Sequence, residues 1–170
     1  MRVSFLFFSL IVFLTAALGP TACDNGAHGL KKGDPAPEFS LPGLGKGEFV
    51  TFPADFQGKV VAIRFWADWC PYCDHEMREL EPVYQKYRDR GLVILAINVH
   101  QDQPTASRFA KRLGISYNVL LDTQGKTAAA YQVIGLPTTY LIDHNGRIST
   151  KIIGESTAQL FERLVAELLP

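Results

Sequence analysis

Apolar runs separated by polar segments occur along most of the chain, and their lengths predict which elements they form. The runs at 60–66 (VVAIRFW) and 92–99 (LVILAINV) are nearly continuous, which is typical of strands buried on both faces of a sheet. Shorter runs predict further strands at 39–41, 49–52, 119–121, 138–142 and 147–153. The last two flank the turn sequence DHNG, so we expect them to pair as a hairpin.

Helical patterns lie between most of these strands. We expect helices at 70–90, 104–113, 126–131 and 156–169. Pro82 lies inside the first helix and should kink it, because proline lacks the backbone N–H that a helix interior requires. Strands that alternate with helices, followed by a hairpin and a last helix, predict an α/β fold with a mixed central β-sheet flanked by helices.

Residues 1–22 have the pattern of a targeting segment. Arg2 is the only charged residue before Asp24, and the apolar run at 5–18 is shorter than the ~20 residues that a spanning helix needs. Such a run suits the apolar core of a secretory signal. The sequence therefore predicts a signal peptide or membrane anchor at 1–22, a small polar tether at 23–32 and one domain at 33–170.

Three interpretations of this first segment stay open. Small residues precede Cys23 as in a bacterial lipoprotein signal, in which Cys23 would be lipidated after cleavage, although Pro20 stands where such signals carry an aliphatic residue. The segment could instead stay as an uncleaved anchor, or cleavage after Ala17 could release a soluble protein. Each interpretation sends the rest of the chain outside the cytoplasm, and we expect a membrane-anchored protein of the cell envelope that faces the periplasm.

Composition and charge exclude several classes of protein. Lys+Arg and Asp+Glu number 17 each, so no basic excess points to a nucleic-acid partner. With 47% hydrophobic and 20% charged residues, the chain has the composition of a globular domain. Its three cysteines are too few for a disulfide scaffold or a four-cysteine zinc site, and the four histidines are scattered. We therefore expect no metal site.

A C-x-x-C pair carries the candidate chemistry. Cys70 and Cys73 follow the buried strand 60–66 at the expected start of a helix, where unpaired N–H groups and the helix dipole favour a thiolate. We expect Cys70 to face solvent, and Cys73 to lie deeper and attack a mixed disulfide that Cys70 forms. Pro71 suits the first helical turn. The pair alone would also fit half a zinc site or an inert bridge, but no second C-x-x-C accompanies it.

Three motifs together resemble the thioredoxin fold. The sequence W-C-P-Y-C after the strand 60–66 resembles the redox motif of that fold, and 135–143 (GLPTTYLID) resembles its cis-proline segment. The segment 35–41 (PAPEFSL) is similar to the entry strand of the membrane-anchored TlpA/ResA-like branch. The resemblance covers about 33–170 and implies a thioredoxin fold with an N-terminal β extension.

The resemblance also implies roles for individual residues. Cys70 would attack, Cys73 would resolve, and Pro137 would be the cis-proline that faces the disulfide, although by sequence alone it could equally begin an edge strand in the trans form. Glu76 shares a helix face with Cys73 and would accept its proton; otherwise it is a solvated helix residue. The residues expected to contact substrate are Trp69, Pro71, Tyr72, Leu136 and Pro137.

Two positions depart from the pattern of the family. Arg64 stands in the apolar strand where ordinary thioredoxin has a buried aspartate, and an unpaired charge there would be costly. Either Arg64 pairs with Glu76 beneath Cys73, or it extends to the edge of the sheet. Arg78 stands where many relatives have proline, and the proline comes later, at Pro82. The shape of the groove beside the cysteines is therefore open.

These observations favour an extracytoplasmic thiol–disulfide oxidoreductase, and within that class a reductase of protein disulfides. Asp68 and Asp74 place negative charge near Cys70, which favours a reducing couple, whereas the helix N-terminus acts in the opposite direction. Apocytochrome c is the best-known substrate class of the branch. We expect a monomer that takes electrons from a membrane thiol donor and uses no cofactor besides its own disulfide.

Two alternatives come from other classes of protein. A peroxiredoxin-like peroxidase would need Thr three residues before the attacking cysteine, and Ala67 stands there. A Sco-like copper-binding chaperone would separate its cysteines by three residues and add a histidine, whereas two residues separate Cys70 and Cys73.

Overall fold

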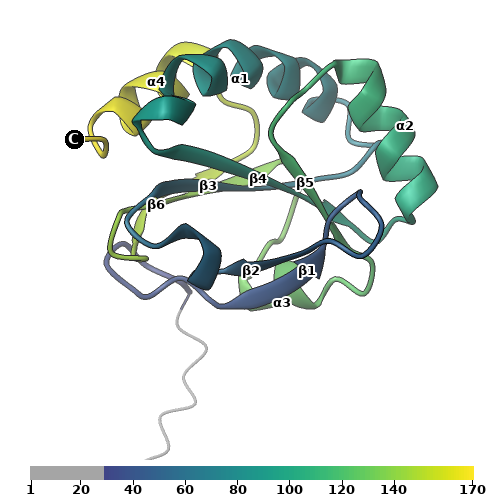
Figure 1. Ribbon diagram of the computed structural model, residues 1–170, viewed down its shortest axis with the longest axis horizontal. Helices are drawn as coiled ribbons and strands as arrows, with labels where there is room; N and C mark the ends of the chain where they lie inside the picture. The colour runs from purple at the N-terminus through teal and green to yellow at the C-terminus, as the bar shows by residue number, and fades with distance from the viewer. Residues whose placement is uncertain (1–28) are drawn as a thin grey trace, which may run out of the picture.

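The structure is a computed structural model, and it describes residues 29–170 (Figure 1). The apolar run at 5–18 and Cys23 lie outside the described residues, so the boundaries expected for the signal and the tether stay predictions. Within 29–170, every helix is too short or too polar to cross a membrane.

A mixed five-stranded sheet forms the centre of the domain, in the order β5-β4-β3-β6-β7. Its strands are β3 (Val60–Trp66), β4 (Leu92–Val99), β5 (Asn118–Asp122), β6 (Thr138–Ile142) and β7 (Ile148–Ile153). The first three run parallel, and β6 is antiparallel to both β3 and β7. The mixed sheet and the closing hairpin that the apolar pattern predicts are thus confirmed.

Helices cover one face of this sheet, and a hairpin with a short helix covers the other (Figure 1). The first face carries α1 (Cys73–Tyr87), α2 (Gln103–Leu113) and α4 (Ala158–Ala166). The second face carries β1 (Phe39–Pro42), β2 (Phe49–Phe52) and α3 (Lys126–Ala130). A short 3₁₀ helix, η1 (Ala54–Phe56), was not anticipated from the sequence, and a second, η2 (Arg88–Arg90), forms the end of the helix expected at 70–90.

Strand β3 divides its side chains between two cores. Every residue of this strand is buried, as the continuous apolar run predicts. Successive side chains of a strand point to opposite faces, so Ala62 and Trp66 join the core under the helices while Ile63 joins the core under the hairpin. By the same alternation Arg64 points to the helical face, where it is 0% exposed.

The first helix begins later than the sequence suggests. Helix α1 starts at Cys73 rather than Cys70, because residues 67–72 form turns instead. The Cys70 N–H donates to the Ala67 carbonyl and the Cys73 N–H donates to the Cys70 carbonyl, at 3.3 and 3.2 Å, in place of helical hydrogen bonds. The helix then continues through Pro82 as far as Tyr87.

Tyr131 is fully buried in an aromatic cluster that joins the hairpin to the sheet. Its ring lies against Phe39, Phe65 and Tyr140, and its hydroxyl donates to the Pro37 carbonyl at 2.7 Å. Burial raises the pKa of Tyr131 far above its usual value. The fold therefore holds the neutral phenol, while the unfolded chain ionises near pH ~10.

This difference predicts a loss of stability in alkali. A raised pKa means that the contribution of Tyr131 is complete below pH ~10 and declines as the pH rises above it. We expect Tyr131→Phe to cost about 1 kcal/mol at pH 8, through the lost hydrogen bond, and to weaken the decline between pH 9 and 11. Urea unfolding across that range measures both effects. An unchanged slope in the variant would show that another group causes the decline.

Candidate active site

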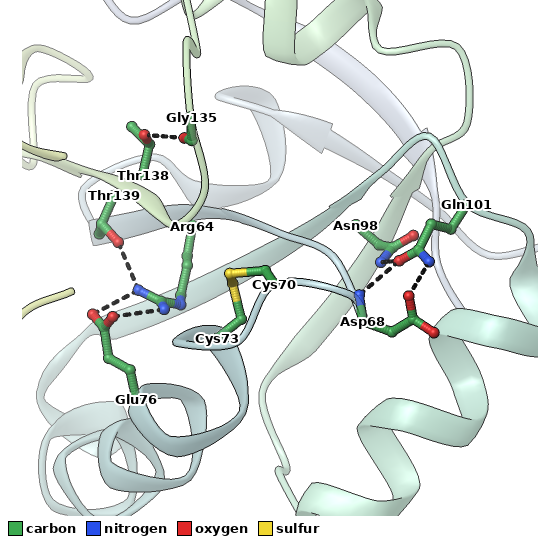
Figure 2. Close-up of a disulfide and its surroundings, with 10 residues drawn as sticks. All are labelled: Arg64, Asp68, Cys70, Cys73, Glu76, Asn98, Gln101, Gly135, Thr138 and Thr139. Carbon is green, nitrogen blue, oxygen red and sulfur yellow. Dashed lines mark hydrogen bonds and ion pairs between the residues drawn. A yellow bond between two sulfur atoms is a disulfide. The ribbon is translucent and has the colours of Figure 1, made fainter. Parts of the chain in front are cut away.

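The Cys70–Cys73 disulfide lies where β3 gives way to α1 (Figure 2). The two Cα atoms are 5.4 Å apart, and the side chains are 2% and 0% exposed. The expectation that Cys70 faces solvent is therefore wrong for the disulfide form. The bond ties its sulfur to Cys73, and Leu136 packs against the core cluster that contains both cysteines.

The loop before β6 carries a second feature of the site. The Leu136–Pro137 peptide bond is cis, the form that the resemblance implies. Two hydrogen bonds hold this segment: the Thr138 hydroxyl donates to the Gly135 carbonyl at 2.7 Å, and the Gly154 N–H donates to the Pro137 carbonyl at 2.9 Å. Pro137 is itself buried, and Leu136 is half-buried.

Large apolar side chains are exposed around the disulfide. Trp69 is 68% exposed, Tyr72 is 57% exposed, and Pro71 between the cysteines is exposed as well. Ile134, which the sequence analysis did not single out, is 86% exposed. A groove of about 310 Å³ opens between Trp69 and the loop that carries Ile134 and Leu136. Trp69 and Ile134 therefore share one apolar groove with Leu136, the residue before the cis-proline.

Arg64 and Glu76 form an ion pair inside the domain (Figure 2). The two terminal nitrogens of Arg64 donate to the two carboxylate oxygens of Glu76 at 2.7 and 2.8 Å. Both side chains are buried, at 0% and 1% exposure. Thr139 accepts a further hydrogen bond from Arg64 at 3.1 Å, and the Ser156 hydroxyl donates to Glu76 at 2.9 Å. The pairing hypothesis is confirmed, and the alternative that Arg64 reaches the sheet edge is wrong.

A polar network on the other side of the disulfide holds the loop before Cys70 (Figure 2). The Gln101 side-chain oxygen accepts from the Asp68 N–H at 2.9 Å and from the Asn98 amide at 2.8 Å. The Gln101 amide in turn donates to the Asp68 carboxylate. Gln101 was not expected from the sequence, although the sequence does contain a signal for it. The carboxyl ends of the parallel strands β3 and β4 lie together, so residues following each strand should meet.

Two arginines accompany Asp74 at the start of α1. Arg78 donates to Asp74 at 2.8 Å, and Arg112 of α2 donates to it at 3.3 Å. The hydrogen bond from Arg78 lowers the pKa of Asp74, with a smaller contribution from Arg112. The negative charge that the sequence places near Cys70 is therefore offset at Asp74. Arg78, at the position of the expected proline, joins α1 to α2 in this way.

Within the described residues, no group of three or more His, Cys, Asp or Glu side chains could hold a metal ion. The site consists of a buried disulfide, an ion pair beneath it and an exposed apolar surface beside it. This arrangement suits the exchange of disulfides with another polypeptide.

Comparisons with known proteins agree with this chemistry. Residues 32–151 match the AhpC/TSA family. A thiol–disulfide oxidoreductase ResA of Geobacillus kaustophilus is 34% identical over 165 residues, which are 95% of this chain and 94% of the relative. The chain belongs to the AhpC/TSA family.

Solved structures of this family and its thioredoxin-fold relatives have the same architecture. A thiol:disulfide interchange protein DsbE of Chlorobium tepidum has a TM-score of 0.75 and 34% identity, and the match covers 82% of this chain and 99% of that one. A second thioredoxin-family interchange protein of the same organism has a TM-score of 0.73 and 28% identity, over 81% and 97% of the two chains. The expected thioredoxin fold is confirmed. The family member described here is a thiol–disulfide oxidoreductase, and Cys70–Cys73 is its redox-active disulfide.

Proposed function

We propose that this oxidoreductase works as a reductase of protein disulfides outside the cytoplasm, with Cys70 as the attacking and Cys73 as the resolving cysteine. The single observation that carries the proposal is the position of the disulfide. Cys70 precedes α1, is 2% exposed and follows the exposed Trp69 directly, whereas Cys73 is 0% exposed on the first turn of α1. An incoming disulfide would therefore meet Cys70 first.

The exchange transfers two electrons from the cysteine pair to the substrate. The Cys70 thiolate attacks one sulfur of the substrate disulfide, forms a mixed disulfide, and releases the other substrate sulfur as a thiolate that takes a proton from water. Cys73 then loses its proton and attacks the Cys70 sulfur. This closes the Cys70–Cys73 disulfide and expels the second substrate thiolate, which is protonated in turn. A dithiol donor regenerates the pair by the reverse exchange.

The neighbouring residues take up supporting roles in this proposal. An extended substrate lies on the surface of Trp69, Pro71 and Tyr72 and pairs with the backbone at Leu136, because a proline at 137 leaves the backbone of the preceding residue free, as the resemblance to the thioredoxin fold implies. Glu76 is the proposed acceptor of the Cys73 proton. Its carboxylate offers about four lone-pair positions, and Arg64 and Ser156 occupy three of them. One position on the oxygen that Ser156 does not contact is left for a proton.

The location and the partners rest on the sequence. Residues 1–22 act as a signal or an anchor, Cys23 is the proposed lipidation site, and 23–32 tether a monomeric domain at 33–170 to the membrane on its periplasmic side. A membrane-bound dithiol is the proposed electron donor. Apocytochrome c, whose haem attachment requires reduced cysteines, is the proposed substrate class, on the strength of the resemblance to the TlpA/ResA-like branch.

The redox state of the pair in the native cell tests the proposed direction. Cells are quenched with acid, free thiols are alkylated, and the protein is analysed by intact mass, with a Cys70→Ser/Cys73→Ser double variant as the blank. We expect both cysteines to be mostly alkylated, because a donor keeps them reduced. A mostly oxidised pair would contradict the reductase assignment. The same mass distinguishes a lipidated Cys23, an uncleaved segment and cleavage after Ala17.

A further inference from the structure

Arg64 has one N–H group that the ion pair does not use. Its terminal nitrogens donate to Glu76 and Thr139, but its Nε atom is buried and has no hydrogen-bond partner. A buried donor without an acceptor lowers the stability of the fold, and more so when the group is charged. Such a group in a native site suggests that its acceptor is present in another state of the protein.

The position of Arg64 indicates which acceptor this is. On β3 it points to the helical face between Ala62 and Trp66, and its guanidinium reaches Glu76 on α1. Cys73 lies three residues before Glu76, on the same face of that helix. Figure 2 shows the guanidinium between the Glu76 carboxylate and the disulfide, with its side-chain stem on the disulfide side. The Nε atom joins the guanidinium to that stem, so the unused N–H lies on the disulfide side of the guanidinium in this view.

The other groups around the guanidinium keep it in this position. Glu76 accepts hydrogen bonds from the guanidinium and is itself held by a hydrogen bond from Ser156. Thr139 of β6 accepts a further hydrogen bond from the guanidinium at 3.1 Å. Tyr117, whose hydroxyl donates to the Met77 carbonyl, lies within electrostatic reach of the pair, and burial raises its pKa well above the usual value. Tyr117 thus stays neutral and adds no charge that would compete for Arg64.

We propose that Arg64 is a catalytic residue that binds the Cys73 thiolate in the dithiol form, through its Nε–H and its positive charge. This inference rests on the proposed resolving role of Cys73. A sulfur in a disulfide is a weak acceptor, whereas a thiolate is a charged one, so the hydrogen bond forms only when the disulfide opens. The positive charge stabilises the nucleophile that closes the disulfide, and Glu76 both positions the guanidinium and limits its effect on the sulfur.

The redox equilibrium with glutathione measures this stabilisation. In that exchange the protein disulfide takes two electrons from two glutathione thiols, which become one glutathione disulfide. Of the two protons released, one goes to the Cys70 thiol and the other goes to water, because Cys73 is held as the thiolate. A contact made only in the dithiol form shifts the equilibrium constant toward the dithiol. Arg64→Lys keeps the charge and a partner for Glu76 but removes the Nε–H. We expect it to lower the constant about tenfold, which is about 30 mV for this two-electron couple.

Glu76→Gln should act in the opposite direction. It removes the negative charge that compensates Arg64, so the thiolate becomes more stable and the equilibrium constant rises several-fold. A merely structural role for the pair would lower stability in both variants without giving opposite shifts in the constant. The matched control is Arg78→Lys. Arg78 is an exposed arginine on α1, the helix that carries Glu76, and it pairs with Asp74. The equilibrium constant of this variant should stay within about twofold of the wild-type value.

The wild-type protein provides a second test if Arg64→Lys does not fold. In nitrogen-15 arginine spectra, the Nε–H resonance of Arg64 should move downfield on reduction, while that of Arg78 stays in place. An unmoved Arg64 resonance, or equal constants for Arg64→Lys and the wild type, would overturn the inference. Neither result affects the proposed reductase function, which is tested separately by the redox state of the wild-type pair in the native cell.

Discussion

Cys70→Ser is expected to lower the rate of protein disulfide reduction by at least about 10³-fold, because it removes the proposed attacking cysteine. Cys73→Ser should behave differently. Its Cys70 still attacks, so one mixed disulfide per molecule accumulates, but turnover stops because the resolving thiol is absent. Dithiol-driven reduction of insulin measures the rates, and non-reducing electrophoresis detects the mixed disulfide.

The control for this pair of variants is Cys23→Ser, which lies outside the described domain and should leave the rate of the detergent-solubilised protein unchanged. The mixed disulfide should accumulate in Cys73→Ser and not in Cys70→Ser. If Cys70→Ser accumulated the mixed disulfide and Cys73→Ser did not, the assignment of the attacking and resolving cysteines would be reversed.

Arg64→Leu is expected to be the most destabilising single substitution in the interior of the site. It leaves the Glu76 carboxylate buried with no opposite charge, and breaking a buried ion pair in this way costs about 3–5 kcal/mol. For a domain of this size, such a loss lowers the melting temperature by on the order of 10 °C. Urea unfolding of the oxidised protein measures the change in the free energy of unfolding.

The double variant Arg64→Leu/Glu76→Leu separates the ion pair from the packing around it. Two apolar residues of similar volume leave no charge unpaired, so the double variant should recover most of the stability that Arg64→Leu loses. Additive losses, with the double variant less stable than either single variant, would show that the two side chains contribute independently. The ion pair would then not be the unit that stabilises this part of the core.

The architecture could be predicted from the sequence because the buried strands and the first helix have clear patterns of apolar residues and clear residue spacings. Continuous apolar runs identified β3 and β4, and the spacing of Cys73 and Glu76 placed both on one helix face. A charge within the apolar run marked Arg64, since a buried arginine requires a partner. Because side chains alternate along β3, the Arg64 side chain faces α1. From the sequence, an Arg64 side chain that extends to the edge of the sheet was still an alternative.

Other parts of the site depend on tertiary contacts that no local pattern reports. Residues 67–72 were expected to be partly helical, but hydrogen bonds to Gln101 across two strands hold the loop in turns. The exposure of Ile134 follows from the path of its loop. The cis bond before Pro53 had no motif to indicate it, in contrast to the cis bond before Pro137.

The most direct test of the central claim is the stoichiometry of electron transfer from the Cys70–Cys73 pair. Fully reduced protein is mixed with an excess of oxidised insulin, quenched with acid and alkylated, and both products are counted by intact mass. We predict that one Cys70–Cys73 disulfide closes for each insulin disulfide that opens. If the pair stays reduced with insulin but is oxidised by peroxide alone, the protein is a peroxidase and the account is wrong.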